Sequence, residues 1–262
     1  MTDSRPARIW SLVAAQAARH GGPVSAADAC VAAVAAVEVT GAWLIAARGA
    51  EAGHLMRVTD KPSELLAELQ VTLGEGPDLD AAASGGPVLA SDLDETEAVR
   101  RWPAFAPAAR LAGAAAIFAF PLQLGAIRTG VMSLYRARSG PLSAFQLGDA
   151  LIFADTATQL LLDAQDQPVQ DHPAQDQPAR TAGSAAAGPG GQPAYLTRHR
   201  AEIDQATGML TEQLDVGIAE AFIRLRAYAY AHDRRLSDLA RDIVARRLRL
   251  SPDPDPRKDA QG

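Results

Sequence analysis

Residues 114–135 read AAAIFAFPLQLGAIRTGVMSLY and contain two apolar runs that are joined by a turn. The runs are Ala114–Leu122 and Gly130–Tyr135, and Gly125 lies in the turn between them. Two strand-like runs separated by a short glycine-containing turn are typical of a β-hairpin. The sequence therefore predicts a mainly antiparallel sheet that contains this hairpin.

The segments on both sides of the hairpin predict further strands and helices. The expected elements are helices at 6–19, 25–39, 62–69 and 142–163, strands at 41–49, 54–60 and 87–91, and helical turns around 92–105. Helices, then an antiparallel sheet, then a closing amphipathic helix are the pattern of an α+β unit. We expect this unit to span residues 1–165.

A polar segment at residues 166–194 divides the chain. It contains five prolines and four glycines, and Val169 is its only large aliphatic residue. Such a segment cannot bury enough apolar surface to fold. We therefore expect a disordered linker at 166–194, a second folded unit at 195–250 and a disordered tail at 251–262.

The second unit contains three helical patterns, at Thr197–Leu214, at Ile218–Ala231 and after Asp233, which could cap the third helix. Each pattern repeats apolar residues on one face. The predicted core positions are Ile203, Ala206, Leu210, Leu214, Ile218, Ala221, Phe222, Leu225, Ala229, Leu236, Leu239, Ala240 and Ile243. The sequence thus predicts a small three-helix bundle.

The composition excludes several classes of protein. The 262 residues are 48 % hydrophobic and carry a net charge of −6, which argues against a surface that coats nucleic acid or membrane. Only residues 195–250 are positive, with ten basic and eight acidic side chains. The longest apolar runs fall short of the roughly 18 residues of a membrane span, and the N-terminus has no signal pattern, so we expect a cytoplasmic protein.

No catalytic or metal-binding motif is evident. The single cysteine, Cys30, permits no intrachain disulfide, and we expect it to be a small buried side chain. The five histidines lack metal-ligand spacing; His54 could be a cofactor ligand or an ordinary sheet residue. We expect no enzyme, no metal and no identifiable cofactor, while an unknown small-molecule ligand of the first unit stays open.

Gly208 is unusual because it lies within a predicted helix. A helical glycine costs about 1 kcal/mol relative to alanine, so its retention suggests a use for the missing side chain. With Ala201 it would leave a notch on the outer face, where a nucleic-acid backbone could approach closely. The alternative is a tolerated defect.

A basic run with interleaved tyrosines covers the last two helices. Arg226 and Tyr230 are spaced i, i+4, and Arg234, Ser237 and Arg241 share a predicted outward face. Arginine suits phosphate and tyrosine can stack on unpaired bases, a combination typical of RNA binding. Because Asp238 and Asp242 interrupt the run, an ordinary solvated face is the alternative.

Five motifs occur in order in the first unit: LGEGP at 73–77, PVLASDL at 87–93, RWPAF at 101–105, FPLQLG at 120–125 and GVMSLYR at 130–136. Together they resemble the GAF domain, a small-molecule sensory module of many bacterial regulators. The resemblance implies an antiparallel sheet packed with helices. It also implies a role in ligand sensing or in dimerisation.

Two segments of the second unit, IDQATGML at 203–210 and IAEAFIRLRAYAYAHDRRLSDLA at 218–240, resemble the ANTAR domain of transcription antiterminators. This resemblance implies a three-helix RNA-binding module with Ala206, Thr207, Gly208 and Arg235 among its site residues. The family commonly has lysine where this chain has Thr207, so one cationic phosphate contact is missing.

The whole chain is similar to GAF and ANTAR domain regulators of the actinobacterial type. The resemblance implies a homodimer that stabilises hairpins in nascent RNA and so promotes transcription antitermination. Two alternatives stay open: a protein-interaction module that binds no nucleic acid, and a DNA-binding helix-turn-helix protein.

Overall fold

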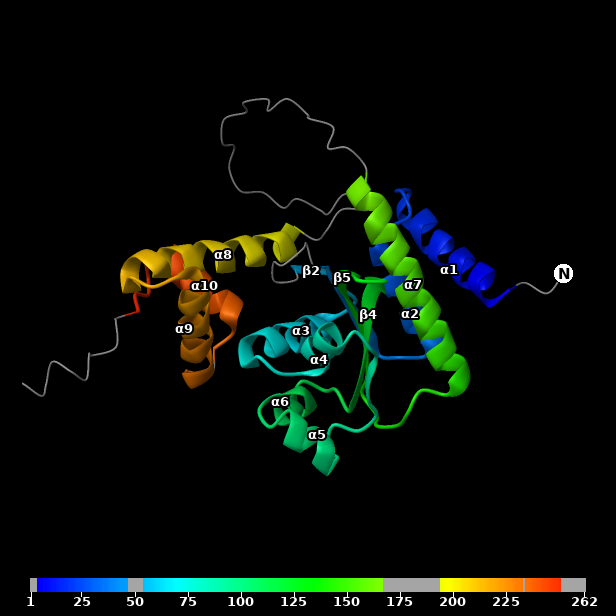
Figure 1. Ribbon diagram of the computed structural model, residues 1–262, viewed down its shortest axis with the longest axis horizontal. Helices are drawn as coiled ribbons and strands as arrows, with labels where there is room; N and C mark the ends of the chain where they lie inside the picture. The colour runs from blue at the N-terminus through cyan, green and yellow to red at the C-terminus, as the bar shows by residue number, and fades with distance from the viewer. Residues whose placement is uncertain (1–3, 47–53, 167–193, 233, 251–262) are drawn as a thin grey trace, which may run out of the picture.

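The structure, a computed structural model, describes residues 4–46, 54–166, 194–232 and 234–250. Among these residues, five strands form one antiparallel sheet in the order β2-β1-β5-β4-β3. The strands are β1 (Gly41–Ala46), β2 (His54–Val58), β3 (Val88–Ala90), β4 (Ala116–Leu124) and β5 (Ile127–Arg136). The predicted hairpin is the β4–β5 pair, and the α+β fold class is confirmed (Figure 1).

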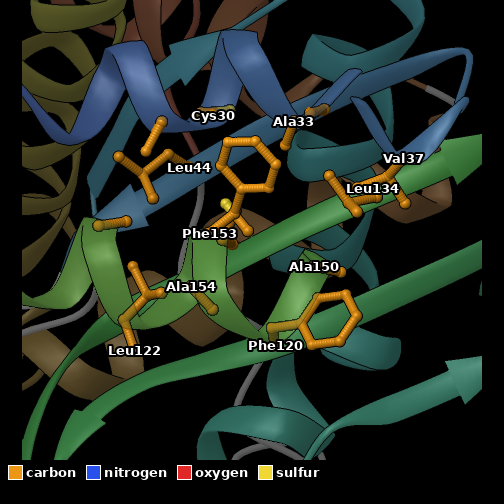
Figure 2. Close-up of a cluster of buried hydrophobic side chains, with 14 of the residues drawn as sticks. Cys30, Ala33, Val37, Leu44, Phe120, Leu122, Leu134, Ala150, Phe153 and Ala154 are labelled. Carbon is orange, nitrogen blue, oxygen red and sulfur yellow. The ribbon is translucent and has the colours of Figure 1, made fainter. Parts of the chain in front are cut away.

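Helices α1 (Arg5–His20), α2 (Ala26–Val37) and α7 (Ala144–Asp166) pack on one face of the sheet. Figure 2 shows part of this apolar layer, with Phe153 of α7 near Cys30 of α2 and Leu44 of β1. Cys30 has no exposed surface, as predicted, and burial raises the pKa of its thiol to about 12. An apolar site of this kind keeps the thiol protonated and unreactive.

Helices α3 (Lys61–Leu73), α4 (Pro77–Ser84), α5 (Thr96–Arg101) and α6 (Phe105–Leu111) belong to the opposite side of the sheet. Their core includes Trp43, Leu66, Leu93 and Phe105, all without exposed surface. The two cores are separated by the sheet, because successive residues of a strand point to opposite faces. The first unit is therefore a layered sandwich.

Two helices on this side differ from the sequence prediction. Helix α3 continues four residues beyond the predicted end and stops at Gly74, whose φ of 73° is left-handed. Helix α4 is absent from the predicted elements because glycines and a proline are typical of a loop, but Pro77 lies in the first turn of this helix, where proline is tolerated. The predicted linker and tail lie outside the described residues, apart from Asp166 and Ala194 at the ends of their helices.

A buried carboxyl group joins α4 to the sheet. Asp78 accepts hydrogen bonds of 2.6 Å from Trp43 Nε1 and 2.6 Å from Ser133 Oγ. Its backbone N–H donates to Oε1 of Gln70 in α3. Burial raises the pKa of Asp78, although the bonds from Ser133 and Trp43 act in the opposite direction. This network fixes α3 and α4 against strands β1 and β5.

We expect Asp78→Ala to destabilise the first unit by roughly 2–4 kcal/mol, because it leaves two buried donors without an acceptor. Urea unfolding followed by tryptophan fluorescence measures this directly, since Trp10, Trp43 and Trp102 all belong to the first unit. The matched control is Glu97→Ala on the exposed surface of α5. Equal free energies of unfolding for the two variants would contradict the role given to Asp78.

Candidate nucleic-acid interface

Within residues 194–232 and 234–250, helices α8 (Ala194–Leu214), α9 (Ile218–Ala231) and α10 (Leu236–Val244) share one apolar core. The fully or nearly fully buried members are Ala206, Leu210, Leu214, Ala221, Leu225, Ala229, Leu236, Leu239, Ala240 and Ile243. These positions confirm most of the predicted inward face. Ile218 was predicted wrongly, since it is 68 % exposed at the start of α9.

The three adjacent residues that the ANTAR resemblance singles out lie in different environments on α8. Ala206 has no exposed surface and contributes to the core. Thr207 is also buried, and its Oγ1 donates to the carbonyl of Ile203. Gly208 faces open space, because a Cβ built there would meet no atom within 4 Å. In this arrangement only Gly208 of the three offers its backbone to a ligand.

Two of the predicted arginines form ion pairs within the second unit. Arg234 donates to Asp242 over 2.5 Å, and this bond raises the pKa of its guanidinium. Arg241 contacts Asp238 at 2.9 Å and Glu202 of α8 at 3.5 Å. Both side chains remain partly exposed, so a nucleic-acid phosphate would have to share them with these carboxylates.

The remaining predicted residues face the first unit, beside which α9 and α10 lie (Figure 1). Arg235 donates from Nε to Oε2 of Glu68 over 2.7 Å, and the backbone N–H of Ser237 donates to Oε1 of the same carboxylate over 2.9 Å. Burial disfavours the charged form of Arg235, but the carboxylates of Glu68, Glu64 and Asp238 together outweigh this effect and raise the pKa of the guanidinium. No motif or spacing in the sequence predicts this contact.

Arg226 and Tyr230 lie on the same side of α9. Arg226 donates from Nε to the carbonyl of Thr72 over 3.1 Å, and burial lowers the pKa of its guanidinium. Tyr230 is 64 % exposed and lies at the edge of a groove that Leu65 and Leu69 of α3 also line. Of the candidate aromatic and basic residues, Tyr230 is therefore the most accessible for stacking.

The sequence prediction missed two exposed cations after α10. Arg246 and Arg249 are exposed, and within the described part of the chain neither guanidinium has an ion pair or hydrogen bond. Their signal was the sequence RRLRL at 246–250, which continues the basic run beyond the residues selected. They add unpaired positive charge to one end of the bundle.

The start of α10 also differs from expectation. Its N-cap is Arg235, whose side chain makes no capping bond, and the predicted cap Asp233 lies outside the described residues. A helix leaves its first backbone N–H groups without an internal acceptor. Glu68 of α3 supplies one acceptor in place of a local cap.

A cavity of about 350 Å³ lies where α9 meets the first unit. Its lining is mainly apolar and includes Leu79, Leu122 and Phe222, with Arg128 and Arg226 as cationic members. The described residues contain no cluster of three or more potential metal ligands. His54, the histidine that could be a cofactor ligand, begins strand β2, but its side chain lies outside the part of the chain that the structure describes.

The geometry defines a small helical module with a basic side, joined to an α+β sandwich. Residues 197–244 match the family model for the ANTAR domain. The match covers α8 from its first turn through the whole of α9 and α10. No protein with a curated description matches the chain.

Several solved structures are similar to the chain. The GAF domain of a phosphoenolpyruvate-protein phosphotransferase from Coxiella burnetii is 12 % identical, with a TM-score of 0.45 over 62 % of this chain and 97 % of that one. The GAF-B domain of DevS from Mycobacterium smegmatis is 18 % identical, with a TM-score of 0.37 over 52 % of this chain and 90 % of that one.

The N-acylhomoserine lactone dependent LuxR family transcription factor CepR2 from Burkholderia cenocepacia is 17 % identical, with a TM-score of 0.45 over 63 % of this chain and all of that one. The family match is thus confined to the second unit, where helices α8 to α10 match the ANTAR domain. No helix among the described residues is long and apolar enough to cross a membrane.

We expect Gly208→Ala to stabilise the second unit by about 0.5–1 kcal/mol, because alanine is the better helix former and its Cβ meets open space. Hydrogen exchange at the amides of α8 in the full chain measures the change. The matched control is Gly217→Ala, which also faces open space but lies at the N-cap of α9, where alanine brings no gain. Faster exchange in Gly208→Ala would contradict the open helical site.

Proposed function

We propose that this protein is a signal-responsive, RNA-binding regulator of the cytoplasm that promotes transcription antitermination by stabilising hairpins in nascent RNA. The observation that carries the proposal is the ANTAR match at 197–244, which coincides with a folded three-helix bundle. The GAF-like unit would receive the signal, and the bundle would bind RNA.

The proposed RNA surface combines an uncovered backbone with side chains that suit RNA. Gly208 allows close approach to α8, Tyr230 can stack on an unpaired base, and arginines can contact phosphates. The proposed set comprises Gly208, Arg226, Tyr230, Arg234, Arg235, Arg241, and the backbone of Ser237. Ala206 and Thr207 would support this surface from the core rather than touch RNA.

A helix-turn-helix function is less well supported by the geometry of α10. A recognition helix presents several free side chains to the base edges of the major groove. Here Ser237 is buried, and Arg241 contacts both Asp238 and Glu202. The protein-interaction alternative draws support from the carboxylates paired with Arg234, Arg235 and Arg241.

We expect Gly208→Arg to weaken the binding of a two-hairpin RNA by about tenfold or more, because a bulky side chain blocks close approach although it adds positive charge. Gly217→Arg is the matched control, since it adds the same charge at another open glycine and should leave affinity unchanged or slightly higher. Titrations at several salt concentrations, with duplex DNA in parallel, measure both effects.

Tighter RNA binding by Gly208→Arg would place the RNA on another face of the bundle. Preference of the wild-type chain for duplex DNA would favour the helix-turn-helix alternative. Absence of binding to either polymer would favour the protein-interaction alternative.

We propose a homodimer as the working form, because two bundles could then engage two hairpins with a high effective concentration. Support comes from apolar side chains that α1 exposes, with Trp10 at 48 % and Leu12 at 38 %. Leu151 of the adjacent α7 is also exposed.

We expect Trp10→Glu to convert a dimer into a monomer, as measured by analytical ultracentrifugation, because it places a charge in the proposed apolar interface. Leu89→Glu on strand β3 changes an equally exposed apolar residue elsewhere and serves as the control. A dimer that persists in Trp10→Glu would contradict this placement of the interface.

A further inference from the structure

The acidic side of α3 binds the two groups of α10 that an RNA phosphate would be expected to use. Glu68 accepts from the guanidinium of Arg235 and from the backbone N–H of Ser237 in the first turn of the helix. An arginine beside a helix N-terminus is a favourable setting for a phosphate, because N–H donors, the helix dipole and a full positive charge converge there. The Glu68 carboxylate occupies that setting with two oxygens.

A second contact, one turn further along α3, fixes α9 to the C-terminal end of that helix. Arg226 donates to the carbonyl of Thr72 in the last turn of α3, where the helix dipole favours a cation. Its guanidinium also lies directly over Gly74, so that a Cβ added at that glycine would collide with Arg226 Nη2. The guanidinium of Arg226 therefore occupies the space that a side chain at position 74 would take.

Apolar contacts accompany these polar ones at the junction, which is the region where α9 and α10 meet the first unit, but they do not fill it. Val71 of α3 packs against the core of the second unit. Phe222 of α9 lines the cavity of about 350 Å³ that remains between α9 and the sheet. This cavity is partly open to solvent, so apolar contacts cover only part of the surface between α9 and the sheet.

Glu64 of α3 also lies near this contact, with its Oε1 3.6 Å from Arg235 Nη2. We propose that the surface formed by Glu64, Glu68, Thr72 and Gly74 at α3 is an internal binding site for the RNA-binding side of the second unit. Glu68 takes the place of an RNA phosphate, and RNA and α3 compete for Arg226, Arg235 and the start of α10. The inference rests on the proposed RNA-binding function and states how the same site is regulated. RNA binds when the second unit leaves α3.

The test changes the acidic residue of the contact in the full chain. Glu68 is suitable because it belongs to the first unit and is no part of the proposed RNA surface. Glu68→Gln keeps the size of the side chain and removes the charge that holds Arg235. In a closed-to-open equilibrium, apparent affinity rises with the open fraction, so affinity for a two-hairpin RNA should increase about fivefold or more. Hydrogen exchange at the Ser237 amide should become faster without RNA.

Glu97→Gln is the matched control. It removes the same charge from the same unit, but Glu97 pairs with Arg100 on the exposed side of α5. Affinity and exchange should stay within about twofold of the wild-type values.

Two results would overturn the inference, and they separate its failure from that of the proposed function. If wild type binds RNA and Glu68→Gln binds it equally well despite faster Ser237 exchange, the contact exists but does not compete with RNA. If no variant binds RNA although exchange becomes faster, RNA binding itself is absent, and competition with it is excluded too. Thermal unfolding followed by tryptophan fluorescence checks the fold, and an unchanged melting temperature confirms that the first unit is folded in each variant.

Discussion

The contact between the Glu68 carboxylate and the start of α10 is the interaction on which this account depends. It satisfies a backbone donor that the helix itself cannot satisfy, and it neutralises the arginine next to that donor. The same carboxylate therefore stabilises a helix terminus and covers a basic surface. A bundle with only a small excess of positive charge can in this way be held against an acidic unit without a large interface.

The buried network at Asp78 gives α3 the rigidity that this contact requires. Gln70 is on the same helix as Glu68, and its Oε1 accepts from the backbone of Asp78, which is bound in turn to Trp43 and Ser133 of the sheet. The position of Glu68 is thus connected to the interior of the first unit. A change of packing on that side of the sheet would therefore act on the second unit through Asp78, Gln70 and the position of α3.

Local patterns in the sequence were sufficient for most of the fold. The hairpin around Gly125 and the inward positions of α8 to α10 follow from periodicities of two and 3.6 residues, and the structure confirms them apart from Ile218. Helix α4 was missed because its flanking glycines and Pro77 have the composition of a loop. Its burial against the sheet through Asp78 is a tertiary effect that no local pattern contains.

The candidate site could be predicted only in part, for a related reason. Gly208 was identified because a glycine within a helix is locally anomalous, and its open surroundings agree with that interpretation. The partner of Arg235 lies 167 positions earlier in the chain, so the spacing of charges within the basic run held no information about it. Likewise, the spacing of residues places Ser237 on an outward face, but helix packing buries it.

Hydroxyl-radical footprinting of the full chain with and without a two-hairpin RNA tests the central claim most directly. Leu65 and Leu69 of α3 share a groove with Tyr230 of α9, so one experiment reports on both sides of the junction. The account predicts that RNA protects Tyr230 from oxidation while Leu65 and Leu69 become more reactive. RNA binding that leaves the reactivity of both leucines unchanged would contradict it.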